Sequence, residues 1–237
     1  MTRLRYRPLL DVRTAPLAHK VIRVAYRPRW PRSDDKVERF VSRRHRLLAA
    51  PVPKVASRTI QEMMGRLSPP DMVEVHESPD AMRERFGDLF AFSFVRNPWA
   101  RIYSCWADKI EDAFTVGKVL ILSRFAGLRP FMPFEEFVEW LGTEAGSDAH
   151  ADRHWLSQTE HLRTSSGEPI VDFVGRIESF EEGLAEIERR SGVTLPRVEA
   201  LNVKTASDAY RSAYSPRARS IVGGRYLADI ETYGYVF

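Results

Sequence analysis

The sequence predicts an α/β domain in which a central parallel sheet is flanked by helices. Strand-like segments alternate along the chain with helix-like segments, a pattern typical of parallel sheets that are covered on both faces. The clearest strand is Phe90–Val95 (FAFSFV), which runs directly into Asn97 and Pro98, a helix cap followed by a first-turn proline. The length of 237 residues and the apolar content of 43% allow a substantial core.

The remaining elements follow in chain order. Residues 1–45 are rich in Arg and Pro with weak periodicity, so they predict a basic N-terminal arm that precedes a single domain, residues 46–237. Short apolar runs predict further strands at 47–52, 72–75 and 170–174. Apolar spacing and capping residues predict helices at 57–67, from 78 onward, at 98–109, 134–141, 179–191 and 215–233.

The net charge of +4 is unevenly distributed along the chain. Residues 1–48 hold 14 Lys/Arg and 4 Asp/Glu, a balance of +10, whereas the other 189 residues hold 22 and 28, a balance of −6. The arm is either a solvated extension along the body or a contact for an anionic membrane, an acidic partner or nucleic acid. A nucleic-acid-binding protein would lose affinity steeply with salt and with removal of the arm.

Composition also bears on the compartment. The chain has no run of about 18 apolar residues, and its first residues lack an apolar signal core, so neither a membrane-spanning helix nor secretion is expected. The single cysteine, Cys105, cannot form an internal disulfide, and we expect it to be a buried small residue. These features favour a cytoplasmic protein and leave its oligomeric state open.

Two junctions at predicted strand ends are basic. The first, 53–59 (PKVASRT), leads into a helix N-terminus, whose free N–H groups and dipole attract anions. It combines cations with hydroxyl donors and small residues: Lys54, Val55, Ala56, Ser57, Arg58 and Thr59. It lacks the GxxxxGK[ST] pattern of a Walker A loop, and taken alone it also fits an ordinary capped helix with surface cations.

The second junction is 96–104 (RNPWARIYS). Arg96 stands at a strand end, where its planar guanidinium can hold a phosphate through two hydrogen bonds, unless it forms a structural ion pair. Ser104 follows eight residues later, about two helical turns along, and can face the same ligand. Two such junctions in one α/β domain predict a ligand with two separated anionic groups.

These segments together resemble the sulfotransferases that use 3′-phosphoadenosine 5′-phosphosulfate (PAPS). PKVASRT and FSFVRNPWARIYSCWADK are similar to the carbohydrate branch, which includes heparan sulfate 2-O-, chondroitin and HNK-1 sulfotransferases. Three further segments resemble that branch in the same order, namely 152–158 (DRHWLSQ), 172–178 (DFVGRIE) and 226–237 (YLADIETYGYVF). The resemblance implies a P-loop-like three-layer sandwich and an enzyme that transfers a sulfuryl group to a hydroxyl, on a carbohydrate or glycolipid.

The resemblance also implies roles for individual residues. Lys54 matches the lysine that contacts the phosphosulfate, and residues 55–59 fall on the same loop, although Arg58 departs from the usual small hydroxyl residue. Arg96 and Ser104 match the pair that binds the 3′-phosphate. Lys204 and Arg211 lie in a C-terminal region that is near the nucleotide in related folds, and either a phosphate contact or surface solvation fits them.

Attack by an acceptor hydroxyl calls for a general base, and histidine suits this role at neutral pH. His76 lies 20 residues before Arg96, a distance comparable to that of the catalytic histidine in related enzymes. His76 is therefore the favoured base. His154 lies in the DxHWxxQ segment and is the second choice, unless it binds the acceptor or positions the base, and Glu74 or Glu77 is a further possibility. No metal is expected, since spacings such as HExxH are absent. A nucleotide-dependent phosphotransferase is the alternative enzyme, but the chain lacks a Walker A loop.

Overall fold

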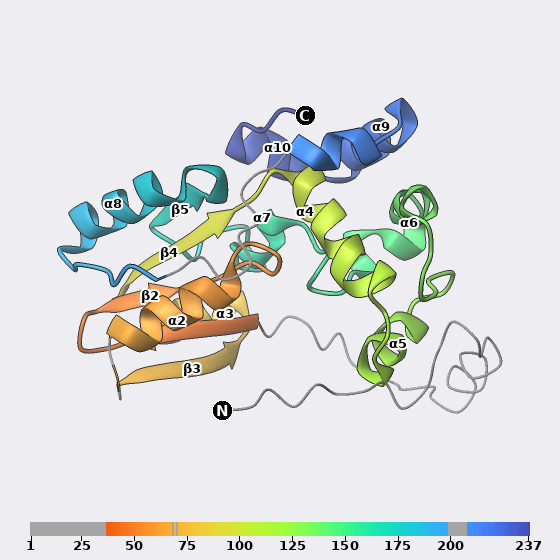
Figure 1. Cartoon of the computed structure of the whole chain (residues 1–237). Coiled ribbons are helices and arrows are strands. Elements are labelled where there is room, and N and C mark those ends of the chain that lie inside the picture. Colours follow the sequence, from red (N-terminus) through yellow and green to blue (C-terminus); the bar gives the residue numbers. More distant parts are fainter. Residues whose placement is uncertain (1–36, 68, 70, 199–207) are drawn as a thin grey trace.

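The computed structural model describes residues 37–67, 69, 71–198 and 208–237, and it contains a five-stranded sheet in the order β3-β1-β2-β4-β5 (Figure 1). The strands are β1 (Val37–Ser42), β2 (Leu47–Ala49), β3 (Met72–Glu77), β4 (Phe90–Val95) and β5 (Phe173–Arg176). The α-helices are α2 (Ser57–Leu67), α3 (Pro79–Phe86), α4 (Pro98–Trp106), α5 (Val116–Ser123), α6 (Phe134–Leu141), α7 (Gln158–His161), α8 (Phe180–Ser191), α9 (Pro216–Arg225) and α10 (Leu227–Tyr233). Shorter helical turns are η2 (Ala107–Glu111), η3 (Glu144–Gly146), η4 (Asp148–His150), η5 (Ile177–Ser179) and η6 (Asp208–Ala213).

The predicted parallel core is confirmed, with one reversed strand. β2, β4 and β5 pair in parallel, whereas β1 is antiparallel to both β2 and β3. β3 therefore runs in the same direction as β2 and β4, and all of these strands have their carboxyl ends at one edge. Ligand sites of such sheets form at that edge.

The boundary predicted for the arm is wrong at its end. Residues 37–42, which were predicted to belong to the arm, form β1 between β2 and β3. The charged residues Glu38 and Arg39 interrupt the apolar pattern that would have predicted a strand, although Arg39 is fully buried in the structure. Residues 1–36, which carry most of the predicted arm, lie outside the described residues.

One face of the sheet is covered by α2 and α8. Phe40 and Glu74 are paired across β1 and β3, so their side chains point to the same face. Gln61 of α2 donates to the Glu74 carboxylate at 3.2 Å. On the same face, α8 approaches β4 so closely that a Cβ on Gly183 would lie 2.5 Å from the Phe94 ring. The contact with Glu74 holds α2, the helix that follows the first basic junction, against β3.

The opposite face carries α7, so helices lie on both faces as predicted. Arg39 points away from the Phe40 face, because successive residues of a strand alternate. Its guanidinium donates to the carbonyl of His161 in α7 at 3.1 Å. The sheet and its flanking helices bury one apolar core, which consists of strand residues together with residues of α2, α3 and α8.

A second core lies beyond the carboxyl edge of the sheet. α4 leaves β4 and leads toward α5 and α6, with α9 and α10 along the same side (Figure 1). Trp155 is fully buried in this core and accepts, at its carbonyl, a 2.6 Å hydrogen bond from the hydroxyl of Tyr226. The helix predicted at 215–233 is divided at Tyr226 into α9 and α10. Within the described part of the chain, no helix combines the length and apolar character needed to cross a membrane.

Candidate functional site

The loop between β2 and α2 adopts an uncommon backbone conformation. Lys54 has φ 71° and Ala56 has φ 49°, so two residues with side chains occupy the left-handed region within one turn. Such strain is concentrated at functional sites, and turns of this kind build concave anion sites from backbone N–H groups. Val55 between them is fully buried, and Ser57 begins α2 directly afterwards. The predicted junction is therefore a strained turn followed by a helix N-terminus. Of its other members, Thr59 is buried and Arg58 is exposed.

Arg96 brings the second junction against the first. Its Nη1 donates to the carbonyl of Lys54 at 3.5 Å. Its backbone is held by Gln158, whose amide accepts from the Arg96 N–H at 2.9 Å and donates to the Arg96 carbonyl at 2.8 Å. Burial lowers the pKa of the Arg96 guanidinium, and the Glu178 carboxylate opposes this shift. Ser104, partly buried, follows two turns along α4.

Arg101, which was not among the residues predicted for the site, connects the same loop to the 152–158 segment. The side chain is almost fully buried and donates to the carbonyls of Pro53 at 3.1 Å, Leu156 at 2.8 Å and Arg153 at 3.5 Å. A buried guanidinium that is paired with carbonyls fixes the backbone segments that it joins. An arginine inside an amphipathic helix carries no sequence signal for this role.

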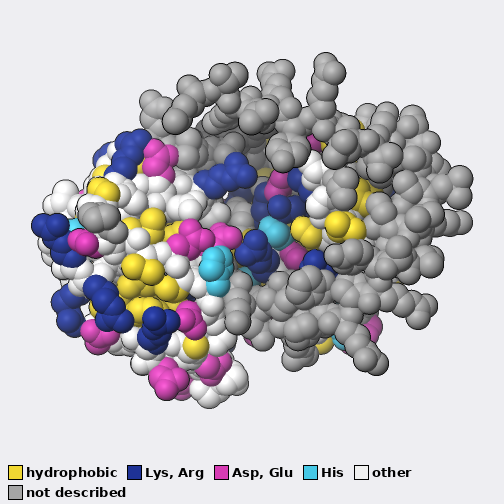
Figure 2. Space-filling model, turned by 90° about the horizontal axis from the view of Figure 1, so that it is seen from below, with side chains coloured by type: hydrophobic (Ala, Val, Ile, Leu, Met, Phe, Trp, Pro, Cys, Tyr) yellow, Lys and Arg dark blue, Asp and Glu magenta, His cyan; other side chains and the backbone are white. Residues whose placement is uncertain are grey.

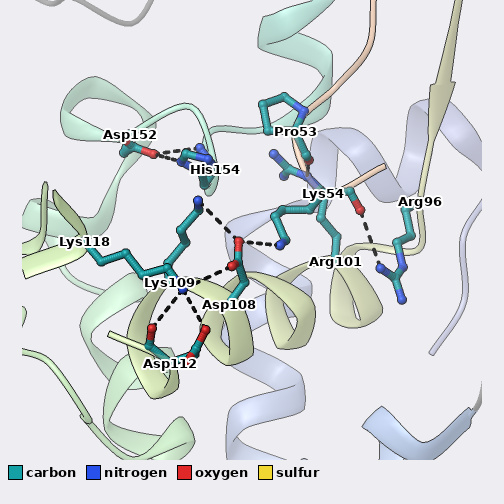
Figure 3. A network of polar contacts seen from close by, with 10 residues as sticks. All are labelled: Pro53, Lys54, Arg96, Arg101, Asp108, Lys109, Asp112, Lys118, Asp152 and His154. Atoms are coloured by element: carbon teal, nitrogen blue, oxygen red, sulfur yellow. Dashed lines mark hydrogen bonds and ion pairs between the residues drawn. The ribbon is translucent and has the colours of Figure 1, made fainter. Parts of the chain in front are cut away.

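Lys54 belongs to a charged network on the far side of the loop (Figure 3). Its Nζ donates to Oδ2 of Asp108 at 2.9 Å, and Lys109 and Lys118 approach the same carboxylate at 3.3 Å and 3.4 Å. Asp108 lies in η2 (Ala107–Glu111), a π-helical turn, and such turns often occur at functional sites. Burial alone would raise the pKa of Asp108, but the hydrogen bond from Lys54 and the three lysine charges hold it well below its usual range. Asp108 is thus a permanent anion at neutral pH.

His154 points toward this network from the 152–158 segment. Figure 3 shows its ring next to the Lys109 ammonium and held on its other side by Asp152. The Asp152 carboxylate accepts hydrogen bonds from both Nδ1 and the backbone N–H of His154. Burial lowers the pKa of the His154 imidazole, and the hydrogen bond and charge of Asp152 oppose this shift. The imidazole is therefore oriented by a buried carboxylate and is poised to stay neutral, as a general base requires.

His76 occupies a different environment. It lies near the carboxyl end of β3, with 53% of its side chain exposed, and its Nε2 is 3.2 Å from the Glu74 carboxylate. The alternative base Glu77 pairs with Arg85 at 2.7 Å. The contacts described for His76 do not join it to Lys54, Arg96 or His154. The structure thus brings those three together at one edge of the sheet and places His76 at the same edge on the outer strand.

The other predicted residues have varied surroundings. Lys204 lies outside the described residues. Arg211 is exposed in η6, with its guanidinium 5.4 Å from the centre of the Phe237 ring. Cys105 is buried in α4, and burial raises the pKa of its thiol to about 12, which suits the predicted inert role. Within the described ranges, no three His, Cys, Asp or Glu side chains are grouped as metal ligands.

Charged side chains of both signs lie on the surface around the site (Figure 2). Figure 2 shows Lys and Arg side chains beside His side chains near the middle of the face seen from below. The Lys109 and Lys118 side chains are partly exposed, at 20% and 19%, and both are paired with Asp108. The three lysines Lys54, Lys109 and Lys118 outnumber the two carboxylates Asp108 and Asp112 that they contact, and this local excess of positive charge attracts a small anionic ligand.

Comparison with known proteins agrees with the resemblance seen in the sequence. The model of the Sulfotransferase family matches residues 37–236. Carbohydrate sulfotransferase 10 of Danio rerio is 24% identical over 247 residues, covering 83% of this chain and 66% of that protein, so the chain spans slightly less than two thirds of this relative. No solved structure matches the chain. Because the family match extends over most of the chain and includes both basic junctions, the chain belongs to the sulfotransferase family.

Proposed function

We propose that this protein transfers the sulfuryl group of PAPS to a hydroxyl of a carbohydrate or glycolipid acceptor. The observation that carries the proposal is the contact between the two junctions, where the Arg96 guanidinium meets the Lys54 carbonyl. One anionic group of the donor would lie on the strained loop and the α2 N-terminus, and the other on Arg96 and Ser104. The name of the zebrafish relative supports a carbohydrate acceptor.

In this reaction the protein mainly positions the reacting groups and stabilises charge, and it need not form a covalent bond to the sulfuryl group. Sulfuryl transfer resembles phosphoryl transfer, in which charge spreads over peripheral oxygens while attacking and leaving oxygens are in line. Lys54 would stabilise the negative charge that develops on the departing 5′-phosphate, together with backbone N–H groups of the loop. Arg96 and Ser104 would fix the nucleotide at its 3′-phosphate. This scheme needs no metal ion.

The general base in this proposal is His154. It stands beside the lysine network, and Asp152 fixes the ring so that Nε2 is left to accept a proton from the acceptor hydroxyl. The notable competitor is His76, which reaches the same edge of the sheet but is exposed and paired with Glu74. The burial of His154 and its partnership with a carboxylate favour it.

Calorimetry with 3′-phosphoadenosine 5′-phosphate (PAP) tests the donor assignment. Wild-type protein should bind PAP, and Arg96→Ala should weaken binding about tenfold or more, since a charge-assisted contact to phosphate is lost. Arg129→Ala, which removes an exposed cation paired with Glu136, serves as the control and should bind like wild type. No binding to wild type, or equal binding by Arg96→Ala, would refute the donor assignment.

Transfer of labelled sulfate from PAPS tests the base and identifies the acceptor. A screen across sugars, glycolipids and phenols should give an acceptor among the first two classes. With that acceptor, His154→Ala should lower kcat about 100-fold or more while PAP binding survives, which is the usual range for loss of a general base. His76→Ala should keep most of the activity. The reverse pattern would assign the base to His76.

A further inference from the structure

Asp108 is an unexpected neighbour for a lysine that meets an anionic donor. Its carboxylate contacts the Lys54 ammonium at 2.9 Å, the shortest of its three lysine contacts. Only 15% of the Lys54 side chain is exposed, so this contact is partly shielded from solvent. In such surroundings, a fixed negative charge near a bound phosphate opposes binding by more than a surface charge would. The Lys54–Asp108 ion pair is therefore expected to affect binding of the donor, and not only the solubility of the surface.

The backbone delivers this carboxylate to Lys54. α4 begins beside Arg96 and continues into the π-helical turn η2, which carries Asp108. The first turn of α4 thus lies next to Arg96, and the helical turn that continues its other end carries the counter-ion of Lys54. Lys109 and Lys118 contact Asp108 as well, so the carboxylate partly neutralises a group of three cations.

We propose that Asp108 holds the Lys54 ammonium in the donor-free protein and competes with the donor nucleotide for it, which limits affinity for the nucleotide. This inference rests on the proposed function, because it takes Lys54 to be a contact of the donor's 5′ group. Asp108 is a positioning residue, since it acts through Lys54 rather than on the reacting atoms. Competition of this kind favours release of PAP after transfer.

Titration of the full chain with PAP provides the test. Asp108→Asn should bind PAP about fivefold or more tightly than wild type, since the Lys54 ammonium no longer has to leave a carboxylate to reach the phosphate. Asp112→Asn is the matched control, because Asp112 lies one turn further on, is 61% exposed and pairs with Lys118. It should bind PAP within about twofold of wild type. General damage to the fold would weaken PAP binding and cannot produce the tightening.

A double-mutant cycle shows whether the effect passes through Lys54. In a Lys54→Gln background, adding Asp108→Asn should tighten PAP binding by less than about twofold. An equal gain in both backgrounds would contradict competition for Lys54. Equal or weaker PAP binding by Asp108→Asn in the wild-type background would overturn the proposal.

A measurement on the wild-type protein covers the case in which Asp108→Asn does not fold. The carboxyl carbon resonances of Asp108 and Asp112 can be followed during PAP addition to selectively labelled protein. The Asp108 resonance should shift as Lys54 turns to the phosphate, whereas the Asp112 resonance should stay nearly unchanged. A bound complex with an unshifted Asp108 signal would overturn the proposal. Wild-type protein that fails to bind PAP would refute the donor assignment itself.

Discussion

The Arg96 junction is held in place by single side chains that are distant from it in the sequence. Gln158 hydrogen-bonds both backbone groups of Arg96, and Gln158 is itself fixed because its N–H donates to Asp229 at 2.8 Å. Asp229 is fully buried and also caps the next N–H of α7, that of Thr159. Removing a buried acceptor leaves donors unpaired, which costs about 1–3 kcal/mol for each group. The DxHWxxQ and C-terminal segments therefore fix the backbone from which Arg96 extends.

Asp152 offers a test of His154 at the residue level. The base must be neutral to act, so kcat/KM should fall as pH decreases through the pKa of His154, which burial places below its ordinary value. Asp152→Asn removes the charge that keeps this pKa up, so the half-maximum of kcat/KM should move to lower pH. The maximal rate should fall about tenfold or more, because the ring loses its orientation. pH profiles of sulfate transfer by both proteins provide the measurement, and an unmoved midpoint would exclude His154.

Residue types at strand ends could be recognised from the sequence, whereas their partners could not. Lys54 and Arg96 stood out because cations follow two predicted strands. Arg101 and Asp108 did not, because each lies in a helix whose sequence is compatible with ordinary surface or core roles. Their contacts depend on where the chain brings the loop before α2, and that is set by packing between distant segments.

At the level of elements, glycine determines how closely α8 packs on the sheet. A Cβ on Gly183 would lie 2.5 Å from the Phe94 ring, and a Cβ on Gly175 of β5 would lie 2.6 Å from the same ring. Gly183→Ala should therefore lower the free energy of unfolding by about 1–3 kcal/mol, since the ring has glycine on both sides and cannot move freely.

Gly224→Ala is the matched control for that substitution. A Cβ on Gly224 in α9 would have no atom of the described residues within 4 Å, so alanine should raise the free energy of unfolding by about 0.5–1 kcal/mol. Chemical denaturation of both variants compares them directly. Destabilisation of equal size in the two helices would show that contact with Phe94 does not matter.

Elements with a strong local pattern were predicted well, and those shaped by tertiary contacts were not. β4 and α2 have the predicted bounds because their apolar patterns are clear. β1 was missed, since Glu38 and Arg39 interrupt its apolar pattern. The division between α9 and α10 was also missed, because Tyr226 leaves the helical backbone range (φ −114°, ψ 30°) at a point where its hydroxyl binds the carbonyl of the distant Trp155. Strand direction follows from pairing between distant segments, so the reversal of β1 has no local signal.

For the whole molecule, the positions of the charged side chains matter more for the site than the net charge does. The segment from residue 49 onward has a balance of 22 Lys/Arg against 28 Asp/Glu, or −6, yet cations meet at the carboxyl edge of the sheet. Acidic side chains are used to hold that edge, as when Glu178 accepts from the Asn97 N–H at 2.7 Å. The basic site is thus built locally, between the sheet core and the second core.

Residues 235–237 pack against the turn that follows Arg96. The side-chain amide of Asn97 donates to the Val236 carbonyl at 2.8 Å, and the Tyr235 hydroxyl donates to Glu178 at 3.0 Å. The Phe237 ring packs edge-on against Trp99, with centroids 5.5 Å apart. The tail therefore supports the turn from which Arg96 extends.

Deleting residues 235–237 should weaken both the fold and the anion site. We expect a loss of about 1–3 kcal/mol in the free energy of unfolding, the range for a broken hydrogen-bond and packing network, and PAP affinity reduced about fivefold or more. Val236→Ala is the control, because Val236 is 78% exposed and the substitution keeps the carbonyl that Asn97 uses. Thermal unfolding and PAP calorimetry on the two variants separate the effects. A shortened chain that binds PAP as tightly as wild type would show that the Arg96 turn is held by Gln158 and Glu178 alone.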